Sequence, residues 1–296
     1  MRILFIGCVV YSKVILEHLL NENYEIVGVL TKDDTGFNAD YFDISSIALK
    51  NNIPFLKTKN VNEEHILSWV KSLNADVTYC FGWNSLIGSD FISLIPRGVI
   101  GYHPASLPQN RGRHPIIWAL VLGLKETAST FFMIGEGADD GDIVSQNKIP
   151  ILEEDSSATL YDKLIESSKS QVIMFTNQLI DNSLVPIKQD HSASNVWRKR
   201  SKVDGKIDFR MSSRSIYNLV RALTKPYPGA TVVSDGNEFV VWKVSIAETS
   251  LVNLEPGKVL AANENKYLVK CGLSTDAVLI EEHDFSNNIS VGSYFI

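Results

Sequence analysis

One short loop of the sequence concentrates side chains that could perform acid–base chemistry. The stretch GYHPASLPQNRGRHP, residues 101–115, carries two histidines and two arginines, and His103 follows directly on an apolar run. An imidazole titrates near neutral pH and a carboxylate beside it can orient it, so a histidine with an acidic partner makes a general acid–base pair. The later stretch GADDGD, residues 137–142, offers such partners, Asp139 among them.

Each of these motifs also has a plain structural interpretation. A histidine followed by proline can end a strand and hydrogen-bond a loop carbonyl, and GADDGD can be a hairpin turn because Gly and Asp suit turn backbones. His114 precedes Pro115 and is expected to have a structural role. His103, His114 and Asp139 lack any recognised spacing of zinc ligands, so no metal is expected.

The elements predicted around these motifs follow an α/β pattern. Apolar runs typical of buried strands occupy residues 2–7, 25–32, 75–82 and 98–103. Helical patterns occupy residues 12–23, 42–53 and 157–182. Two further strands, 127–136 and 141–151, are expected to form a hairpin across GADDGD. The alternation predicts a Rossmann-like, mostly parallel sheet with helices on both faces.

Such a sheet would bring the polar loops together. Ligands of open α/β sheets bind beyond the carboxyl ends of the strands, so we expect Asn84, His103 and Asp139 at one edge. The turn after the first strand, GCVVYS, has one glycine where a dinucleotide fingerprint needs three. A nicotinamide or flavin cofactor is therefore not expected.

The sequence pattern changes after residue 183. Paired strand patterns lie around an Asp-Gly turn and around an Asn-rich turn, which predicts a small β-rich domain. We expect a catalytic domain over residues 1–185, a linker over 186–205 and an OB-like, β-rich barrel domain over 206–296.

The amino-acid composition limits the kinds of molecule that the protein is expected to bind. The 296-residue chain has a formal net charge of −6, whereas nucleic-acid binders usually present a basic face. Cys8, Cys80 and Cys271 are scattered without a CxxC pair, as in a reducing compartment. No signal peptide or membrane span is predicted, so a cytoplasmic protein without a membrane partner is expected.

The two motifs together resemble a known family. GYHPASLPQNRGRHPIIWALVLG followed by TASTFFMIGEGADDGDIV is similar to the signature of N10-formyltetrahydrofolate-dependent formyltransferases, which runs His-x-Ser-x-Leu-Pro-x-x-Arg-Gly and then Gly-x-Asp-x-Gly-Asp. DSSATLYDKL resembles the closing helix of that family's catalytic domain. SKVDGKIDFRMSSRSIYNLVRALTKPYPGA resembles the entry to the C-terminal domain of methionyl-tRNA and sugar-nucleotide formyltransferases, so the similarity covers nearly the whole chain.

The resemblance implies catalytic roles for His103 and Asp139. In this family an acceptor amine attacks the formyl carbon on folate N10 and builds a tetrahedral oxyanion, which hydrogen-bond donors must stabilise. His103 would either donate to that oxyanion or take the amine proton, and Asp139 would orient His103 and assist proton removal. The sequence leaves the division of these roles open.

Gly101 departs from the family pattern. The family has an asparagine two residues before the histidine, and glycine cannot supply the same donor. Asn84 is the expected replacement, because its strand is predicted to neighbour the strand that ends at His103. Asn110 is a weaker candidate.

The resemblance also implies where the two substrates bind. The formyl donor, N10-formyltetrahydrofolate, would lie against the stretches 81–84 and 135–140, with Phe81, Gly82, Trp83, Asn84, Gly135, Gly137, Asp139 and Asp140. The acceptor would contact Tyr11, Ser12, Arg111 and Arg113, although either arginine could equally be structural.

The acidic chain favours a small acceptor. We expect the amine of a nucleotide-linked amino sugar, as in enzymes that make N-formylated sugars for bacterial surface glycans, and no nucleic-acid partner. Methionyl-tRNA formylation is the alternative within the family. A formyltetrahydrofolate hydrolase and a non-catalytic folate-binding protein are alternatives of other classes, and a homodimer remains an open option.

Overall fold

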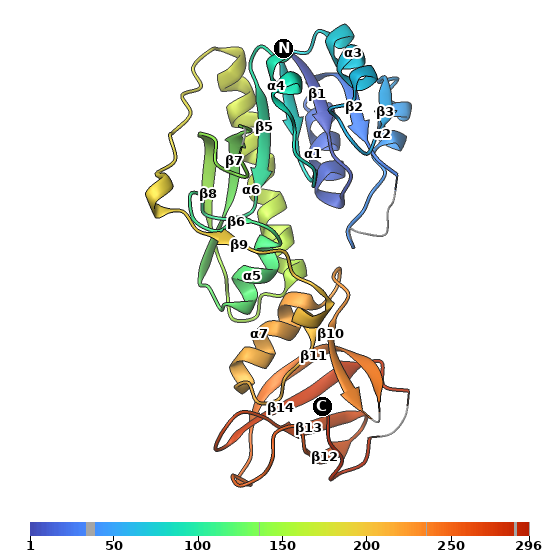
Figure 1. The fold of residues 1–296 in the computed structure, drawn as a ribbon, viewed down its shortest axis with the longest axis vertical. Helices are drawn as coiled ribbons and strands as arrows, with labels where there is room; N and C mark the ends of the chain where they lie inside the picture. The colour runs from blue at the N-terminus through green and yellow to red at the C-terminus, as the bar shows by residue number, and fades with distance from the viewer. Residues whose placement is uncertain (34–38, 136, 235, 287–288, 296) are drawn as a thin grey trace. The chain divides into compact units, whose positions relative to one another are not determined.

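The chain folds into two compact units in a computed structural model, which describes residues 1–33, 39–135, 137–234, 236–286 and 289–295 (Figure 1). Unit 1 comprises Met1–Pro115, Thr127–Ile149 and Asp162–Trp197. Unit 2 comprises Ile116–Glu126, Pro150–Tyr161 and Arg198–Ile296. The motifs with acid–base potential all belong to unit 1.

Unit 1 is built on a seven-stranded sheet with the order β3-β2-β1-β4-β5-β7-β8. Its strands are β1 (Arg2–Ile6), β2 (Glu25–Thr31), β3 (Phe55–Lys57), β4 (Val77–Cys80), β5 (Val99–His103), β7 (Glu126–Met133) and β8 (Ile143–Pro150). The first five of these pair in parallel, whereas β7 runs antiparallel to β5. The predicted Rossmann-like, mostly parallel sheet is confirmed.

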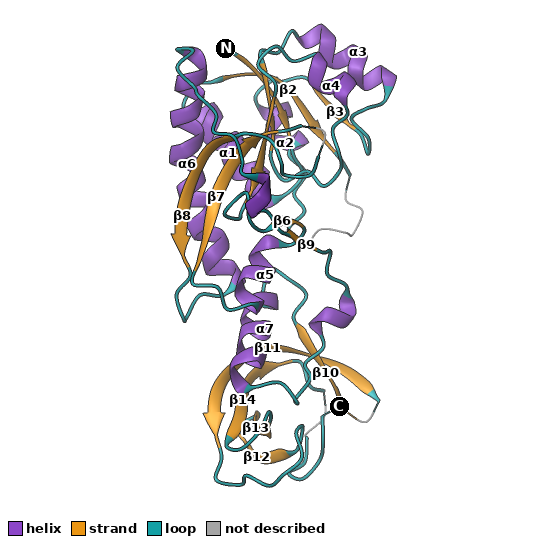
Figure 2. Ribbon diagram, turned by 60° about the vertical axis from the view of Figure 1, so that its left-hand side comes forward, coloured by secondary structure: helices purple, strands orange, loops and turns teal. Residues whose placement is uncertain are grey.

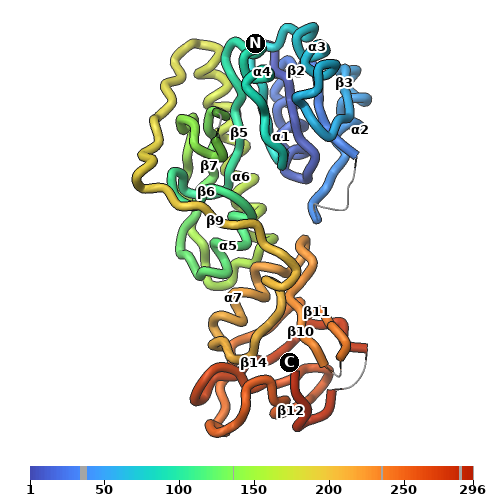
Figure 3. Tube along the Cα trace, viewed as in Figure 1, coloured from blue at the N-terminus to red at the C-terminus, as the bar shows by residue number. Residues whose placement is uncertain are grey.

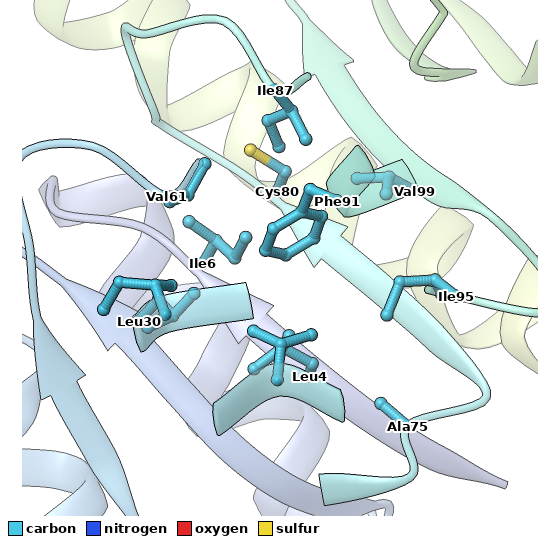
Figure 4. Packing of buried hydrophobic residues seen from close by; sticks show 12 residues of the cluster. Leu4, Ile6, Leu30, Val61, Ala75, Cys80, Ile87, Phe91, Ile95 and Val99 are labelled. Carbon is cyan, nitrogen blue, oxygen red and sulfur yellow. The ribbon is translucent and has the colours of Figure 1, made fainter. Parts of the chain in front are cut away.

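Apolar side chains on alternate residues bury both faces of this sheet. Leu4 and Ile6 of β1 pack in one cluster with Phe91 of α4 (Ser89–Ser93) and Val70 of α3 (Glu64–Leu73), as Figure 4 shows for most of its members. Parallel sheets are covered on both sides, which explains why β4 has four consecutive buried residues.

The opposite face of the sheet carries an aromatic cluster. Phe81 and Phe131 make an edge contact with ring centroids 5.2 Å apart, and Phe131 contacts Phe175 of α6 (Ser157–Ile180). Tyr11 of α1 (Val10–Asn21) stacks on Tyr102 of β5 with centroids 4.2 Å apart. α1 and α6 therefore cover this face of the sheet. The remaining short helix of this region, α2 (Ser45–Lys50), follows β2 in the chain.

Unit 2 contains an antiparallel sheet with the order β10-β11-β14-β13-β12 (Figure 2). Its strands are β10 (Ala230–Ser234), β11 (Asn237–Glu248), β12 (Val259–Asn263), β13 (Lys266–Lys270) and β14 (Asp276–His283). Its helices include α5 (Pro115–Val121) and α7 (Ser213–Leu223), and the Ser212 side chain caps α7 by accepting from the Ser215 N–H. The predicted β-rich C-terminal part is confirmed, while β14 was not foreseen.

The segment after α6 returns along unit 1 (Figure 3). Ile187 exchanges two backbone hydrogen bonds with Ile143, at 2.7 and 2.8 Å. After the short helix η1 (His191–Ala193), β9 (Val196–Trp197) pairs in parallel with β6 (Arg111–Gly112). The region 186–205, expected to be a linker, thus begins with residues paired to unit 1 up to Trp197. It continues into the short helix η2 (Lys202–Gly205) of unit 2.

Within the described ranges, no helix is both long enough and apolar enough to cross a membrane. All three cysteines, Cys8, Cys80 and Cys271, are buried, and none of them forms a disulfide.

We predict that these thiols resist alkylation in the folded protein. Burial raises the pKa of Cys8 to about 11 and that of Cys271 to about 12, and it also raises the pKa of Cys80. Since the thiolate is the reacting species, iodoacetamide at pH 8 should label none of them before urea unfolding and all three after it, as counted by intact mass. Stoichiometric labelling of the native protein would contradict this expectation.

Candidate active site

His103 is the last residue of β5 and is 4% exposed. Its ring nitrogen Nε2 lies 2.8 Å from the backbone oxygen of Asn110. Its other ring nitrogen, Nδ1, lies 3.6 Å from Oδ2 of Asp139. The structure therefore brings together the histidine and the carboxylate that the sequence singled out.

These contacts define which nitrogen of His103 can exchange a proton. A carbonyl oxygen only accepts hydrogen bonds, so Nε2 must carry a hydrogen to bond Asn110. The neutral ring then has its lone pair on Nδ1, and protonation there places a second N–H opposite Asp139. The pair can thus take up and hold one proton at Nδ1.

Asp139 is held in a specific backbone conformation. Its φ of 55° is left-handed, and its Oδ2 accepts a 2.9 Å hydrogen bond from the Gly112 N–H. Gly112 has φ 102°, and a Cβ there would lie 2.3 Å from the Trp197 oxygen, so only glycine fits against β9. The hydrogen bond joins the two sequence motifs directly.

The route by which Asp139 reaches His103 differs from the predicted one. Because β7 is antiparallel to β5, Met133 pairs with Ile100 and Thr130 pairs with His103. The carboxyl end of β7 therefore lies at the opposite end of β5 from His103. The sequence predicted that Asp139 and His103 lie together because each follows a strand. The two do lie together, but the loop after β7 must return along the sheet to reach His103.

The loop after His103 is fixed by hydrogen bonds to its backbone. Thr130 Oγ1 donates to the Ala105 oxygen at 2.7 Å, and Gln146 Nε2 donates to the Leu107 oxygen at 2.9 Å. Ala105 stands where the family signature has serine. Asn195 accepts from the Arg111 N–H through its backbone and from the Asn110 N–H through its side chain.

Gly101 lies against aromatic and aliphatic side chains. It pairs with Phe132 across the sheet, and a Cβ at position 101 would lie 2.9 Å from Phe132 Cζ and 2.9 Å from Ile134 Cγ1. Phe132 is 5% exposed. The space that an asparagine side chain would need at 101 is therefore filled by the Phe132 ring.

Asn84 lies in a small polar group after β4. Its side-chain oxygen accepts a hydrogen bond from Lys32 Nζ, and its backbone oxygen lies 3.5 Å from Arg113 Nη1. Lys32 is 7% exposed, and its Nζ lies 4.4 Å from the centroid of the Trp83 ring. The hydrogen bond from Lys32 determines which end of the Asn84 amide is the oxygen. The amide nitrogen of Asn84 is then the donor that can face a ligand.

The residues expected to contact the acceptor divide into buried and accessible ones. Ser12 is fully buried and donates to the Phe81 oxygen at 2.5 Å, while Tyr11 is buried against Tyr102. Arg111 is buried and donates to Gln189 Oε1 at 2.7 Å. Arg113 is half-buried, and it is the one of the four whose side chain combines solvent access with a contact to the Asn84 stretch.

The residues expected to hold the formyl donor form two stretches. Phe81 is fully buried in the aromatic cluster, and Gly82 has φ 73°, a left-handed conformation that favours glycine. In the second stretch Gly135 and Gly137 flank Glu136, which lies outside the described residues. A Cβ at Gly137 would lie 2.0 Å from Asp140 Oδ2, so the loop is closed around the Asp140 carboxylate.

Two residues of this site were missed by sequence reasoning. Lys32 ends the second predicted strand, and its place at the carboxyl end of that strand was the available signal. Gln189 donates to the backbone oxygens of Asp139 and Gly141 from within the supposed linker, where no local pattern marks it.

Comparison with known proteins identifies the family. A model described as formyl transferase matches residues 1–176, and one described as formyl transferase, C-terminal domain, matches residues 199–294. The chain belongs to the formyltransferase family. It is 30% identical over 301 residues to methionyl-tRNA formyltransferase of Caldanaerobacter subterraneus subsp. tengcongensis, covering 100% of this chain and 96% of the relative.

Solved structures of similar fold include formyltransferases of two kinds. WlaRD, a sugar 3N-formyl transferase studied in the presence of dTDP and 5-N-formyl-THF, has a TM-score of 0.72 and 20% identity, covering 98% of this chain and 99% of that one. Methionyl-tRNA formyltransferase from Clostridium thermocellum has a TM-score of 0.63 and 16% identity, covering 93% and 99%. These similarities support the fold of this formyltransferase.

We predict that asparagine cannot simply be returned to position 101. Gly101→Asn should lower the melting temperature, because overpacking a core typically costs about 1–3 kcal/mol. Combining it with Phe132→Ala should recover part of the loss. Thermal unfolding of both single variants and of the double variant measures how strongly the two substitutions are coupled in their effect on stability. If the two changes in stability simply add, residues 101 and 132 do not compete for the same space.

We predict that Asn84 contributes to turnover. Asn84→Ala should lower kcat about 100-fold, the scale of losing one preorganised hydrogen-bond donor. It should also lower the melting temperature, because it removes the side-chain oxygen that accepts from the buried Lys32 ammonium. Leu86→Ala, at an exposed neighbouring position, is the matched control. Near-normal turnover of Asn84→Ala would remove Asn84 from the mechanism.

Proposed function

We propose that this formyltransferase transfers the formyl group of N10-formyltetrahydrofolate to the primary amine of a nucleotide-linked amino sugar. The observation that carries the choice of acceptor is the charge of the protein. Residues 1–197 contain fifteen Lys and Arg against twenty-three Asp and Glu, and residues 198–296 contain thirteen against eleven. Neither part has the excess of basic residues that binding a long polyanion calls for.

Several basic side chains of unit 2 also lie beside carboxylates. Ion pairs there are Arg198–Asp204, Lys202–Glu238, Arg210–Asp208, Arg214–Glu153, Lys243–Glu281 and Lys258–Glu255. A transfer RNA would have to compete with these carboxylates for each contact. A nucleotide sugar carries only two phosphates, which one or two accessible cations such as Arg113 can serve.

His103 and Asp139 are the proposed acid–base pair. The amine loses a proton as it attacks the formyl carbon, and Nδ1 of His103 with Asp139 beside it can take up that proton. The bond from the formyl carbon to N10 then breaks, and the same proton can pass to N10 of the departing tetrahydrofolate. Asn84, through its amide nitrogen, is the proposed donor to the oxygen on which negative charge develops. In this proposal Phe132 excludes the family's own donor from position 101, so the task moves to a neighbouring strand.

The stretch 81–84 has a free donor suited to a folate. The Trp83 indole Nε1 is buried and has no hydrogen-bond partner within the described part of the chain. Buried donors are usually satisfied, so an acceptor on a bound ring system would complete this one. When bound, N10-formyltetrahydrofolate would supply the activated formyl carbon. The residues of the chain would orient that carbon.

Methionyl-tRNA formylation is the second candidate. It is favoured by the similarity in sequence to methionyl-tRNA formyltransferases, which extends over the whole chain. The charge balance described above is the argument against it.

We predict formylation of a nucleotide amino sugar and none of charged initiator tRNA. The purified protein should first be screened with dTDP, UDP, GDP and CDP, because a ligand that binds the native state raises the melting temperature. Amino sugars linked to the stabilising nucleotide are then incubated with N10-formyltetrahydrofolate, with formyl-methionyl-tRNA formation measured in parallel. Product should be absent in the His103→Asn variant.

The other outcomes are equally informative. Formyl-methionyl-tRNA as the main product would replace the proposed acceptor with tRNA. Formate release at the same rate with and without any amine would indicate a hydrolase. Tight folate binding without turnover in every assay would indicate a non-catalytic folate-binding protein.

A further inference from the structure

We propose that Gln189 is a positioning residue that holds Asp139 in place for the chemistry at His103. The inference rests on the proposed function for its kinetic test. Gln189 belongs to the segment that follows α6 and is 6% exposed. Nothing in its local sequence marks it, and its role emerges only from its contacts.

The side-chain amide of Gln189 clamps the backbone on either side of the Asp139 turn. Nε2 donates to the Asp139 oxygen at 2.9 Å and to the Gly141 oxygen at 2.7 Å. An amide nitrogen has two hydrogens, so both donors are used. The hydrogen bond to its carbonyl thus holds Asp139 in a left-handed backbone conformation. A non-glycine residue adopts this conformation at a cost in free energy.

The other end of the amide is fixed by Arg111. Its Nη2 donates to Gln189 Oε1 at 2.7 Å and lies 3.1 Å from Nδ1 of His191. A guanidinium only donates and backbone carbonyls only accept, so a flipped amide would oppose all of its neighbours. One orientation of Gln189 therefore satisfies every contact.

These bonds close a circuit around Asp139. Arg111 is followed by Gly112, whose N–H binds the Asp139 carboxylate at 2.9 Å. The Asp139 carboxylate is thus held by the backbone of Gly112, and the Asp139 carbonyl is held by Gln189. Gln189 is held in turn by the side chain of Arg111. The circuit fixes Asp139 relative to Nδ1 of His103, 3.6 Å away.

Loss of the clamp should affect the chemical step more than binding. Gln189→Ala removes both donors, so the turn can shift and carry the carboxylate away from His103. Gln189→Glu keeps an acceptor for Arg111 but has no N–H for the two carbonyls. Small displacements of reacting groups cost up to about 100-fold in rate, so both variants should lower kcat at least about tenfold while the KM for each substrate stays within about twofold. Lys188→Ala, at the exposed neighbouring position, is the control and should keep wild-type kcat.

A measurement without turnover tests the same clamp if no acceptor is found. Selective 15N-glycine labelling resolves the Gly112 amide, whose hydrogen exchange reports its bond to Asp139. Exchange at Gly112 should accelerate about tenfold or more in Gln189→Ala and in Gln189→Glu, and not in Lys188→Ala, under conditions where global stability exceeds the local opening. Unchanged Gly112 exchange overturns the proposal. So does an unchanged kcat of folded Gln189→Glu, even where its melting temperature falls.

Discussion

The hydrogen bond from the Gly112 N–H to the Asp139 carboxylate is the contact on which the site depends. It joins a loop that follows a parallel strand to a loop that follows an antiparallel one, and neither sheet pairing alone would bring their side chains together. A carboxylate that accepts a backbone N–H is held without a cation beside it, so it stays available to a neighbouring imidazole. Residue 112 can lie against β9 because it has no side chain, since a Cβ there would meet the Trp197 oxygen.

The sequence predicted the fold and the central pair for different physical reasons. Continuous apolar runs such as that of β4 follow from burial on both faces, so strands and helices of unit 1 were readable from periodicity. His103 and Asp139 were chosen because of their chemistry and their family resemblance. The direction of β7 was not foreseen, since it depends on sheet pairing that no local pattern encodes.

Contacts over long sequence separation account for what was missed. Lys32 and Asn84 are separated by 52 positions, and Gln189 and Asp139 by 50. A glutamine in a polar stretch looks like any solvated residue until the fold buries it. For Arg111 a ligand contact and a structural role were both open, because the sequence could not reveal that a distant amide oxygen accepts its hydrogen bond.

The exchange at Gly101 illustrates how a core and a site share volume. The Phe132 ring lies across the sheet from Gly101, on the same side of the pleat as His103. A larger apolar side chain here adds to the packing of the β5–β7 pair and at the same time shuts out a polar group. In the proposed mechanism, the hydrogen-bond donor to the developing oxyanion therefore comes from the end of a neighbouring strand.

The path of the chain after α6 bears on how this protein can be divided. Residues 187–197 lie in the chain between α6 and η2. Contacts to other residues of unit 1 come from Ile187, Gln189, Asn195 and the short strand β9. The N-terminal family match ends at residue 176. A fragment cut at that residue would keep every strand of the seven-stranded sheet. It would lack residues 187–197, which contact the loop after His103 and the loop that carries Asp139. A fragment that is meant to keep both loops of the candidate site in place therefore has to extend through Trp197, 17 residues beyond the end of α6 at Ile180.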